Sequence, residues 1–150
     1  MPQSLANLLV HIIFSTKDRQ PFIKQNIEKQ LYSYMVRIFR ECDSPAIIIG
    51  GTENHVHILF SLSKKYRLSK VIEDIKKSSS KWIKTKRLEY KKFYWQNGYG
   101  AFSIGTSGKM ATIKYIRNQK EHHRKRTFQA EFVKFLNKYQ IKYDERYVWD

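Results

Sequence analysis

Apolar and polar positions follow two different periods along this chain, and each period predicts one type of secondary structure. Short apolar runs bounded by turn residues are typical of buried strands, expected here at 8–15, 46–50, 55–61 and 99–104. Apolar residues that recur every three or four positions predict amphipathic helices at 23–41, 69–86, 109–125 and 129–139. Ser69 is expected to cap the second helix. The last helix should turn four apolar side chains inward: Phe132, Val133, Leu136 and Tyr139.

The order of these elements indicates the fold. Strand, helix, strand, strand, helix and strand form the split βαβ arrangement, and two helices follow. We therefore expect an α+β fold with a ferredoxin-like split βαβ antiparallel sheet, helices on one face of that sheet, and further C-terminal helices. Strands 46–50 and 55–61 flank a short turn and should form an antiparallel hairpin. No repeat or linker divides the chain, so residues 1–150 are expected to form a single domain.

The charge of the chain indicates the class of partner. The 29 Lys and Arg residues exceed the 13 Asp and Glu residues, which gives a formal charge of +16 spread from Lys17 to Arg146. Such a field attracts polyanions such as nucleic acid, although a basic ribosomal or membrane-surface protein has a similar composition. Cys42 is the only cysteine, which fits a reducing cytoplasm. The chain has no basic leader at its start and no apolar run near 20 residues, so we expect a soluble cytoplasmic protein.

Two histidines mark the third predicted strand. His55 and His57 are separated by Val56, and side chains alternate across a strand, so the two imidazoles should project from one face. Val56 and Ile58 should face the core on the other side. Two adjacent imidazoles can share a divalent cation. Taken alone, so short a motif is more often one packed histidine and one solvent histidine without a metal.

A tyrosine and a glutamine add to this pair. Tyr115 and Gln119 are four residues apart and should share one face of the third predicted helix. The Gln119 side-chain oxygen can supply a third, neutral ligand, and the Tyr115 hydroxyl can lie beside it. A phenol with a pKa of about 10 is protonated at neutral pH, so attack on a phosphate would need a cation to stabilise charge. Spacing alone does not separate Tyr115 from the other tyrosines, which number 10 in all.

These residues resemble the single-tyrosine HUH transposases, a family that includes short insertion-sequence transposases and the transposases associated with repetitive extragenic palindromes. The histidine, hydrophobic residue, histidine motif is His55-Val56-His57, and the catalytic helix of the family is similar to 115–119. Segments 11–17, 94–103 and 121–125 are also similar to the family. The resemblance therefore covers nearly the whole chain in order.

The resemblance implies a function and a site. It implies that the chain binds single-stranded DNA with a hairpin and that Tyr115 of a C-terminal catalytic helix attacks a backbone phosphate. The products would be a 5′-phosphotyrosine and a free 3′-hydroxyl that later reseals a strand. Magnesium or manganese would be held by His55, His57 and Gln119. The enzyme would act as a homodimer, with an active site that two subunits can share through a flexible joint at 105–108.

Several residues are candidates for DNA contact or for structural roles. Lys76, Lys77 and Lys81 form a basic helix face, Trp95 and Tyr99 could stack on unpaired bases, and Arg117 lies on the tyrosine helix. His122 and His123 are expected at a solvated helix end, and His11 is expected to pack in the core or beside the site. Three alternatives stay open: a non-catalytic single-stranded nucleic-acid-binding module, a host-adopted relative acting on palindromic repeats, and a metal-dependent nuclease that uses water.

Overall fold

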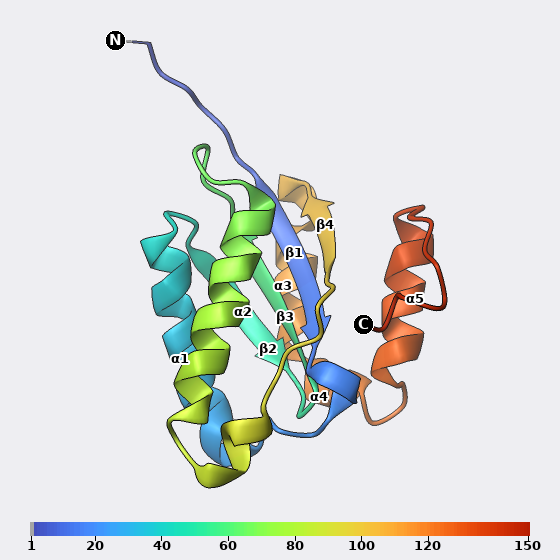
Figure 1. Cartoon of the computed structure of the whole chain (residues 1–150). Coiled ribbons are helices and arrows are strands. Elements are labelled where there is room, and N and C mark those ends of the chain that lie inside the picture. Colours follow the sequence, from blue (N-terminus) through green and yellow to red (C-terminus); the bar gives the residue numbers. More distant parts are fainter. Residues whose placement is uncertain (1) are drawn as a thin grey trace.

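A four-stranded antiparallel sheet forms the centre of the protein (Figure 1). The computed structural model describes residues 2–150. The strands are β1 (Leu9–Ser15), β2 (Ala46–Gly51), β3 (His55–Ser61) and β4 (Gly100–Ile104), arranged in the order β2-β3-β1-β4. Every neighbouring pair is antiparallel, including the hairpin of β2 and β3. This connectivity confirms the expected ferredoxin-like split βαβ sheet.

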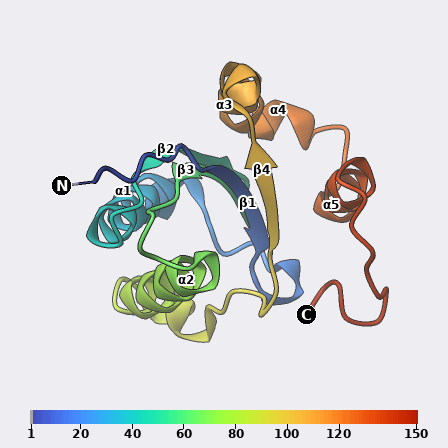
Figure 2. The same cartoon turned by 90° about the horizontal axis from the view of Figure 1, so that it is seen from above.

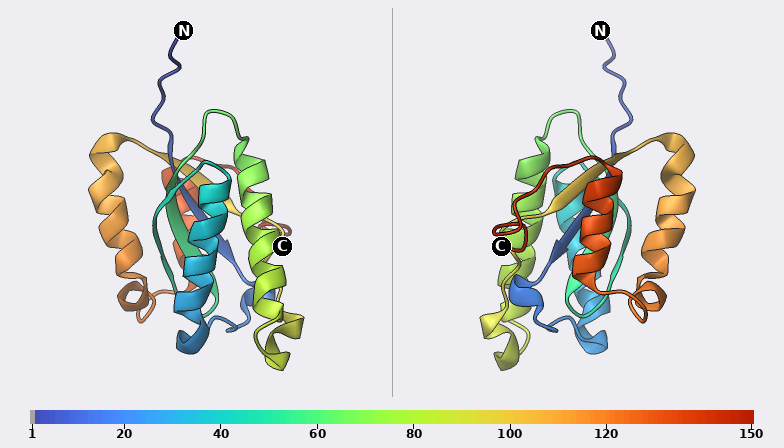
Figure 3. Two further views of the ribbon diagram at one scale, coloured as in Figure 1. Left: turned by 90° about the vertical axis from the view of Figure 1, so that its left-hand side faces the viewer. Right: turned by 90° about the vertical axis from the view of Figure 1, so that its right-hand side faces the viewer.

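Helices cover both faces of the sheet, and the two sets differ. Figure 2 shows α1 (Gln25–Glu41) and α2 (Leu68–Lys84) together on one face, which confirms the expected pair of helices. The opposite face carries α3 (Lys109–Arg117), α4 (Gln119–His122) and α5 (Phe128–Lys138), as the two side views in Figure 3 also show. Within residues 2–150, no helix is both long and apolar enough to cross a membrane.

The main core lies between the sheet and the first pair of helices. Alternate strand residues such as Phe14, Val56 and Ile58 point into it, where they meet the apolar sides of α1 and α2. Side chains alternate across each strand, so the residues between them point to the opposite face. His55 and His57 therefore project together toward the C-terminal helices, as the alternation predicts, and both are buried.

Three details differ from the sequence-based expectations. The helix expected at 109–125 is interrupted at Asn118, whose φ of −98° and ψ of 23° are not helical, and α4 ends at His122. Asn is a weak helix former, which is consistent with a break there. Ser69 does not cap α2, because the helix already begins at Leu68 and the residue at its N-cap makes no side-chain capping bond. Val133 is only half-buried, because α5 turns Glu131 inward instead.

Two glycines allow helices to lie close to the sheet on its second face, the face that carries α3, α4 and α5. A Cβ atom on Gly50 of β2 would lie 2.4 Å from the carbonyl oxygen of Ile116 in α3. A Cβ atom on Gly100 of β4 would lie 2.7 Å from the ring of Phe132 in α5. Both approaches are closer than a side chain allows, so glycine at these positions sets how near α3 lies to β2 and α5 lies to β4.

Candidate active site

The polar residues of the second face converge on one carboxylate, that of Glu131 on α5. One oxygen, Oε1, lies 2.8 Å from Nε2 of His57 and 3.0 Å from Nε2 of His123. Nε2 of His55 is 3.5 Å from the same oxygen. Glu131 is only 1% exposed, so these side chains take the place of water around its charge.

The other carboxylate oxygen of Glu131 binds the tyrosine and the glutamine. Oε2 accepts a hydrogen bond from the Tyr115 hydroxyl, and Nε2 of Gln119 lies 3.3 Å away. That contact orients the Gln119 amide, so its oxygen lies 3.2 Å from Nε2 of His55. The exposed ring of His122 stacks on Tyr115, with 4.6 Å between ring centroids. The structure thus brings together His55, His57, Gln119 and Tyr115, the four residues singled out from sequence.

Hydrogen bonds behind His55 fix which of its nitrogens is free. Nδ1 of His55 lies 2.8 Å from the side-chain oxygen of Asn54 and 2.9 Å from the Thr52 hydroxyl. The Asn54 oxygen can only accept, which favours the tautomer with the proton on Nδ1. The lone pair on Nε2 then faces the side-chain oxygens of Gln119 and Glu131, which are also acceptors. Because no proton lies between these acceptor atoms, a cation bound among them would be stabilised by all three.

His11 supports His57 from behind in the same manner. Nε2 of His11 lies 2.9 Å from Nδ1 of His57, and both rings are buried. If a cation binds Nε2 of His57, the ring proton must sit on Nδ1, where His11 can accept it. Partners of this kind set the tautomer and ring orientation of metal-binding histidines. His11 therefore lies beside the site, which is one of the two positions expected for it.

The electrostatics of the cluster favour a bound cation. Burial lowers the pKa of His55 to about 4, and burial also lowers the pKa values of His57 and His11. Burial alone would raise the pKa of Glu131, but its contacts with the surrounding imidazoles, that of His123 first, hold this pKa well below its usual range. Near neutral pH the ionised carboxylate of Glu131 thus lies beside the neutral imidazoles of His55 and His57. Its net negative charge is buried, and a cation would compensate it.

The donor atoms also fit a divalent cation. The ligand atoms of His55, His57, His123 and Glu131 all lie within 4.8 Å of one another. The Gln119 oxygen lies at the edge of this group through its contact with His55. Imidazole nitrogens suit transition metals, and carboxylate or carbonyl oxygens suit magnesium and manganese. This set can therefore hold the metal that the sequence suggests, with His123 and Glu131 as additional donors.

The sequence did not predict two of these donors, His123 and Glu131. His123 was expected at a solvated helix end, which is wrong, because α4 ends early and turns the half-buried ring toward Glu131. No motif marks Glu131. Its only signal in the sequence is its place on the apolar side of α5, between Phe128 and Phe135, where a carboxylate needs a buried partner.

Of the candidate DNA contacts, Lys76, Lys77 and Tyr99 line one cavity, whereas Arg117 lies elsewhere. Lys77 and Lys81 are exposed on α2, Arg117 is exposed at the end of α3, and Tyr99 is 39% exposed. Lys76 is only half-buried and holds a loop, since its Nζ lies 2.8 Å from the carbonyl oxygen of Gln96. Burial lowers the pKa of Lys76 to about 8.

Trp95 differs from the other candidate contacts. It is 6% exposed, its ring lies between Phe14 and Phe93, and its Nε1 donates to the Ser79 hydroxyl at 2.9 Å. In this structure neither face of the ring is open to a base, so Trp95 contributes to the main core.

Comparisons with known proteins place this site in a family. The fold is similar to that of a Deinococcus radiodurans R1 protein provisionally named a transposase, with a TM-score of 0.62, 16% identity and coverage of 79% of this chain and 98% of that one. It is also similar to a REP-associated tyrosine transposase bound to a REP hairpin, with a TM-score of 0.62, 14% identity and coverage of 82% and 72%. No curated protein sequence matches significantly. Residues 4–119 match the family described as "Transposase IS200 like", and because they include His55, His57, Tyr115 and Gln119, the chain belongs to the IS200-like transposase family.

Proposed function

We propose that this protein is a single-strand DNA transposase that cleaves and rejoins DNA beside hairpin ends through a 5′-phosphotyrosine on Tyr115. The observation that carries the proposal is the meeting of nucleophile and cation ligands at Glu131. The Tyr115 hydroxyl binds one carboxylate oxygen while His57 and His123 bind the other. A nucleophile held beside a cluster of metal ligands is the arrangement that attack on a phosphate requires.

The proposed reaction exchanges one ester bond for another. The Tyr115 oxygen forms a bond to phosphorus as the bond from phosphorus to the 3′-oxygen breaks. The phenolic proton passes to Oε2 of Glu131, which already accepts its hydrogen bond, and from there through water to the leaving 3′-oxygen. In the reverse direction, a 3′-hydroxyl attacks the phosphotyrosine and releases Tyr115. No bond energy is lost between the two steps, so no high-energy cofactor is needed.

His55, His57 and Gln119 would hold magnesium or manganese, with His123 and Glu131 as further donors. The bound cation would polarise the scissile phosphate and offset the charge that develops on its oxygens. Without that positive charge, burial and the Glu131 carboxylate raise the pKa of Tyr115 above its ordinary value, which keeps the phenol protonated. Tyr115 is therefore expected to attack only when the cation is bound.

The proposed substrate and assembly follow from the family and from exposed residues. A relative of similar fold was solved with a REP hairpin, which supports a hairpin as the DNA partner here. Lys77, Tyr99 and the half-buried Lys76 line one cavity of about 360 Å³, where DNA could contact them. We also propose a homodimer, with residues 105–108 as the joint if subunits exchange their tyrosine helices. A Cβ atom on Gly105 would have no neighbour within 4 Å, so there is open space beside this joint.

The test compares covalent capture of DNA by the wild-type protein and by Tyr115→Phe. Labelled single-stranded DNA carrying hairpins from the gene's flanking sequence is incubated with magnesium or manganese and run on a denaturing gel. We expect label to stay with the wild-type protein and to be lost with Tyr115→Phe. Tyr147→Phe is the matched control, because Tyr147 is 62% exposed and lies outside the site.

Two results would contradict the proposal. Cleavage that persists in Tyr115→Phe would mean that water is the nucleophile and that the protein is a metal-dependent nuclease. Tight hairpin binding without any adduct, in either metal, would mean a non-catalytic binding module or a host-adopted relative.

A further inference from the structure

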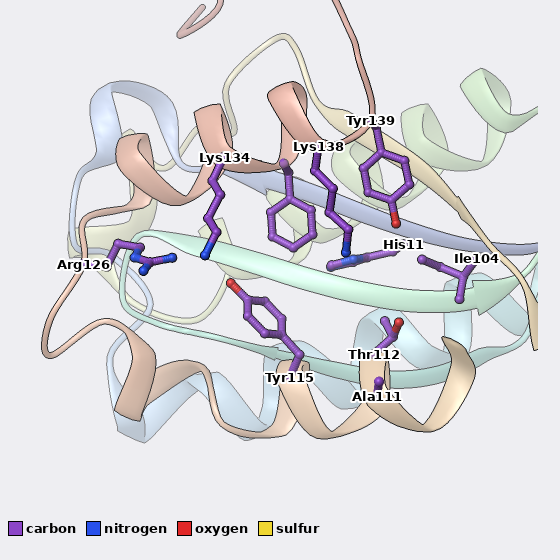
Figure 4. A pocket seen from close by; sticks show the side chains of 10 residues that line it. His11, Ile104, Ala111, Thr112, Tyr115, Arg126, Lys134, Lys138 and Tyr139 are labelled. Carbon is purple, nitrogen blue, oxygen red and sulfur yellow. The ribbon is translucent and has the colours of Figure 1, made fainter. Parts of the chain in front are cut away.

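A cavity of about 280 Å³ lies between α3 and α5, directly beside the nucleophile (Figure 4). We propose that this cavity binds the unpaired nucleotide that flanks the scissile phosphate. The inference rests on the proposed function, since it assigns to the cavity a part of the same DNA strand. Nothing in the family match covers α5, because that match ends at residue 119.

The position of Tyr115 connects the cavity with the cation ligands. Its hydroxyl donates to Glu131 on the side of the cluster, and its ring also lines the cavity. Figure 4 shows Tyr115 extending from α3 into the same space that Lys134 and Lys138 enter from α5. A phosphate attacked by Tyr115 must have its neighbouring nucleotide next to that ring. The cavity is the space available for it.

The charge of the cavity suits a phosphate. Three cationic side chains line it, those of Arg126, Lys134 and Lys138, and no acidic side chain does. Among residues 2–150, none of the three appears in a salt bridge or a side-chain hydrogen bond, although seven other Lys and Arg side chains there pair with a carboxylate. Cations that converge without a carboxylate create a local positive potential, and a DNA backbone would satisfy it.

The rest of the lining suits a base. Phe135 and Tyr139 on α5 are half-buried and present aromatic surface to the cavity. Aromatic rings bind unpaired bases by stacking, with little dependence on base identity. The volume of the cavity is close to the lower limit of about 300 Å³ for small-ligand pockets. It therefore has room for one nucleotide unit and not for a duplex.

Arg126 extends this cavity toward a second one. It also lines a larger cavity of about 790 Å³ that is bordered by His123, on the other side of the loop between α4 and α5. Because the two cavities share one arginine, they can take successive nucleotides of one strand. A single anion would need only one of the two cavities, which favours a polynucleotide as the ligand.

The test is a titration of the Tyr115→Phe protein, in which no strand transfer can occur. Thymidine 5′-monophosphate is added while backbone amide resonances are followed by NMR, with inorganic phosphate and thymidine as separate probes. We expect shifts at Thr112, Phe135 and Tyr139, and binding at least fivefold tighter for the nucleotide than for phosphate. The double variant Lys134→Gln, Lys138→Gln should weaken nucleotide binding at least tenfold. Lys142→Gln, an exposed lysine outside the cavity, is the matched control.

A second measurement uses the substrate class itself. The affinity for a single-stranded oligonucleotide is measured against salt concentration, and each lysine that contacts a phosphate should contribute about 0.7 to the logarithmic slope. Equal affinity for phosphate and nucleotide, or shifts away from the cavity, would overturn the inference, as would an unchanged slope in the double variant. If the adduct on Tyr115 still forms in that case, the proposed strand transfer stands. Nucleotide binding in the cavity without any adduct would instead reject the strand transfer.

Discussion

Glu131 is the residue on which the candidate site depends most. It lies outside the family match, yet its two oxygens contact both the histidine ligands and the nucleophile. A carboxylate in this position can act in one of two ways. It can donate an oxygen to the cation, or it can occupy the place of the cation until the metal displaces it. The two roles give opposite effects when the charge is removed.

We expect Glu131→Gln to weaken manganese binding by about 10- to 100-fold, which is the usual loss when a supporting group of a metal site is removed. The amide keeps the shape of the side chain but brings no negative charge to a buried set of neutral imidazoles. Calorimetric titration with manganese measures the effect, and Glu145→Gln on the exposed C-terminal segment is the control. Tighter binding in Glu131→Gln would show that the carboxylate competes with the cation.

The residues that could be predicted from sequence are those whose spacing fixes their direction. His55 and His57 lie two apart in a strand, so they share a face whatever packs against it. Tyr115 and Gln119 became candidates because a family motif separated them from other residues of the same type. Glu131 and His123 could not be found in this way. Their role depends on how α4 ends and where α5 packs, which no local pattern records.

At the scale of elements, the site depends on how closely α3 packs against β2. Gly50 permits this contact, because a Cβ atom there would meet the backbone of Ile116. Ile116 is buried next to Tyr115, so any outward movement of α3 also moves the nucleophile. The position of Tyr115 relative to the histidines is thus set by a backbone contact on the neighbouring strand.

We expect Gly50→Ala to lower the free energy of unfolding by about 1–3 kcal/mol, as overpacking usually does. The formation of the Tyr115 adduct should fall by a larger factor than the loss of folded protein explains, because the helix is displaced. Urea unfolding and the denaturing-gel assay measure the two effects. Ser33→Ala is the control, since Ser33 is exposed on α1 and lies outside the site. Equal adduct formation by Gly50→Ala and wild type would argue against this role of the contact.

The order of elements was predictable, whereas their junctions were not. Apolar periods mark the strands and helices because each buries one side, and their order is sufficient to indicate the split βαβ sheet. The break at Asn118 leaves the apolar period almost unchanged. The apolar pattern of the sequence therefore does not reveal the break between α3, which carries Tyr115, and the short helix α4, which begins at Gln119.

At the scale of the whole molecule, the two faces of the sheet have different roles. The face toward α1 and α2 holds the largest apolar cluster, while the face toward α3 and α5 holds smaller clusters around the polar site. Most of the hydrophobic stabilisation therefore lies away from the buried imidazoles and carboxylate. The cost of burying ionisable groups is concentrated on the second face, and it should appear as a dependence of stability on pH.

We expect the protein without divalent metal to lose stability as the pH falls from about 6.5 to about 4. The ordinary pKa of a histidine is 6.5, and burial lowers that of His55 to about 4 in the folded protein. Between these values the unfolded chain binds a proton that the folded protein does not, so acid favours unfolding. A shift of this size corresponds to about 3 kcal/mol at 1.36 kcal/mol per pKa unit. His57 and His11 shift in the same direction and add to the loss.

Urea unfolding at a series of pH values, with a chelator present, measures this loss as a falling midpoint. In His55→Gln the loss between pH 6.5 and 4 should be smaller, because the buried imidazole that resists protonation is gone. Manganese should raise the midpoint at pH 7 and do so less at pH 5, because ligand binding to the folded state stabilises it and protons compete for the imidazoles. A midpoint that stays constant across this range would mean that the imidazoles on the second face are solvated and free to ionise, and the buried cluster proposed to hold the cation would not exist in solution.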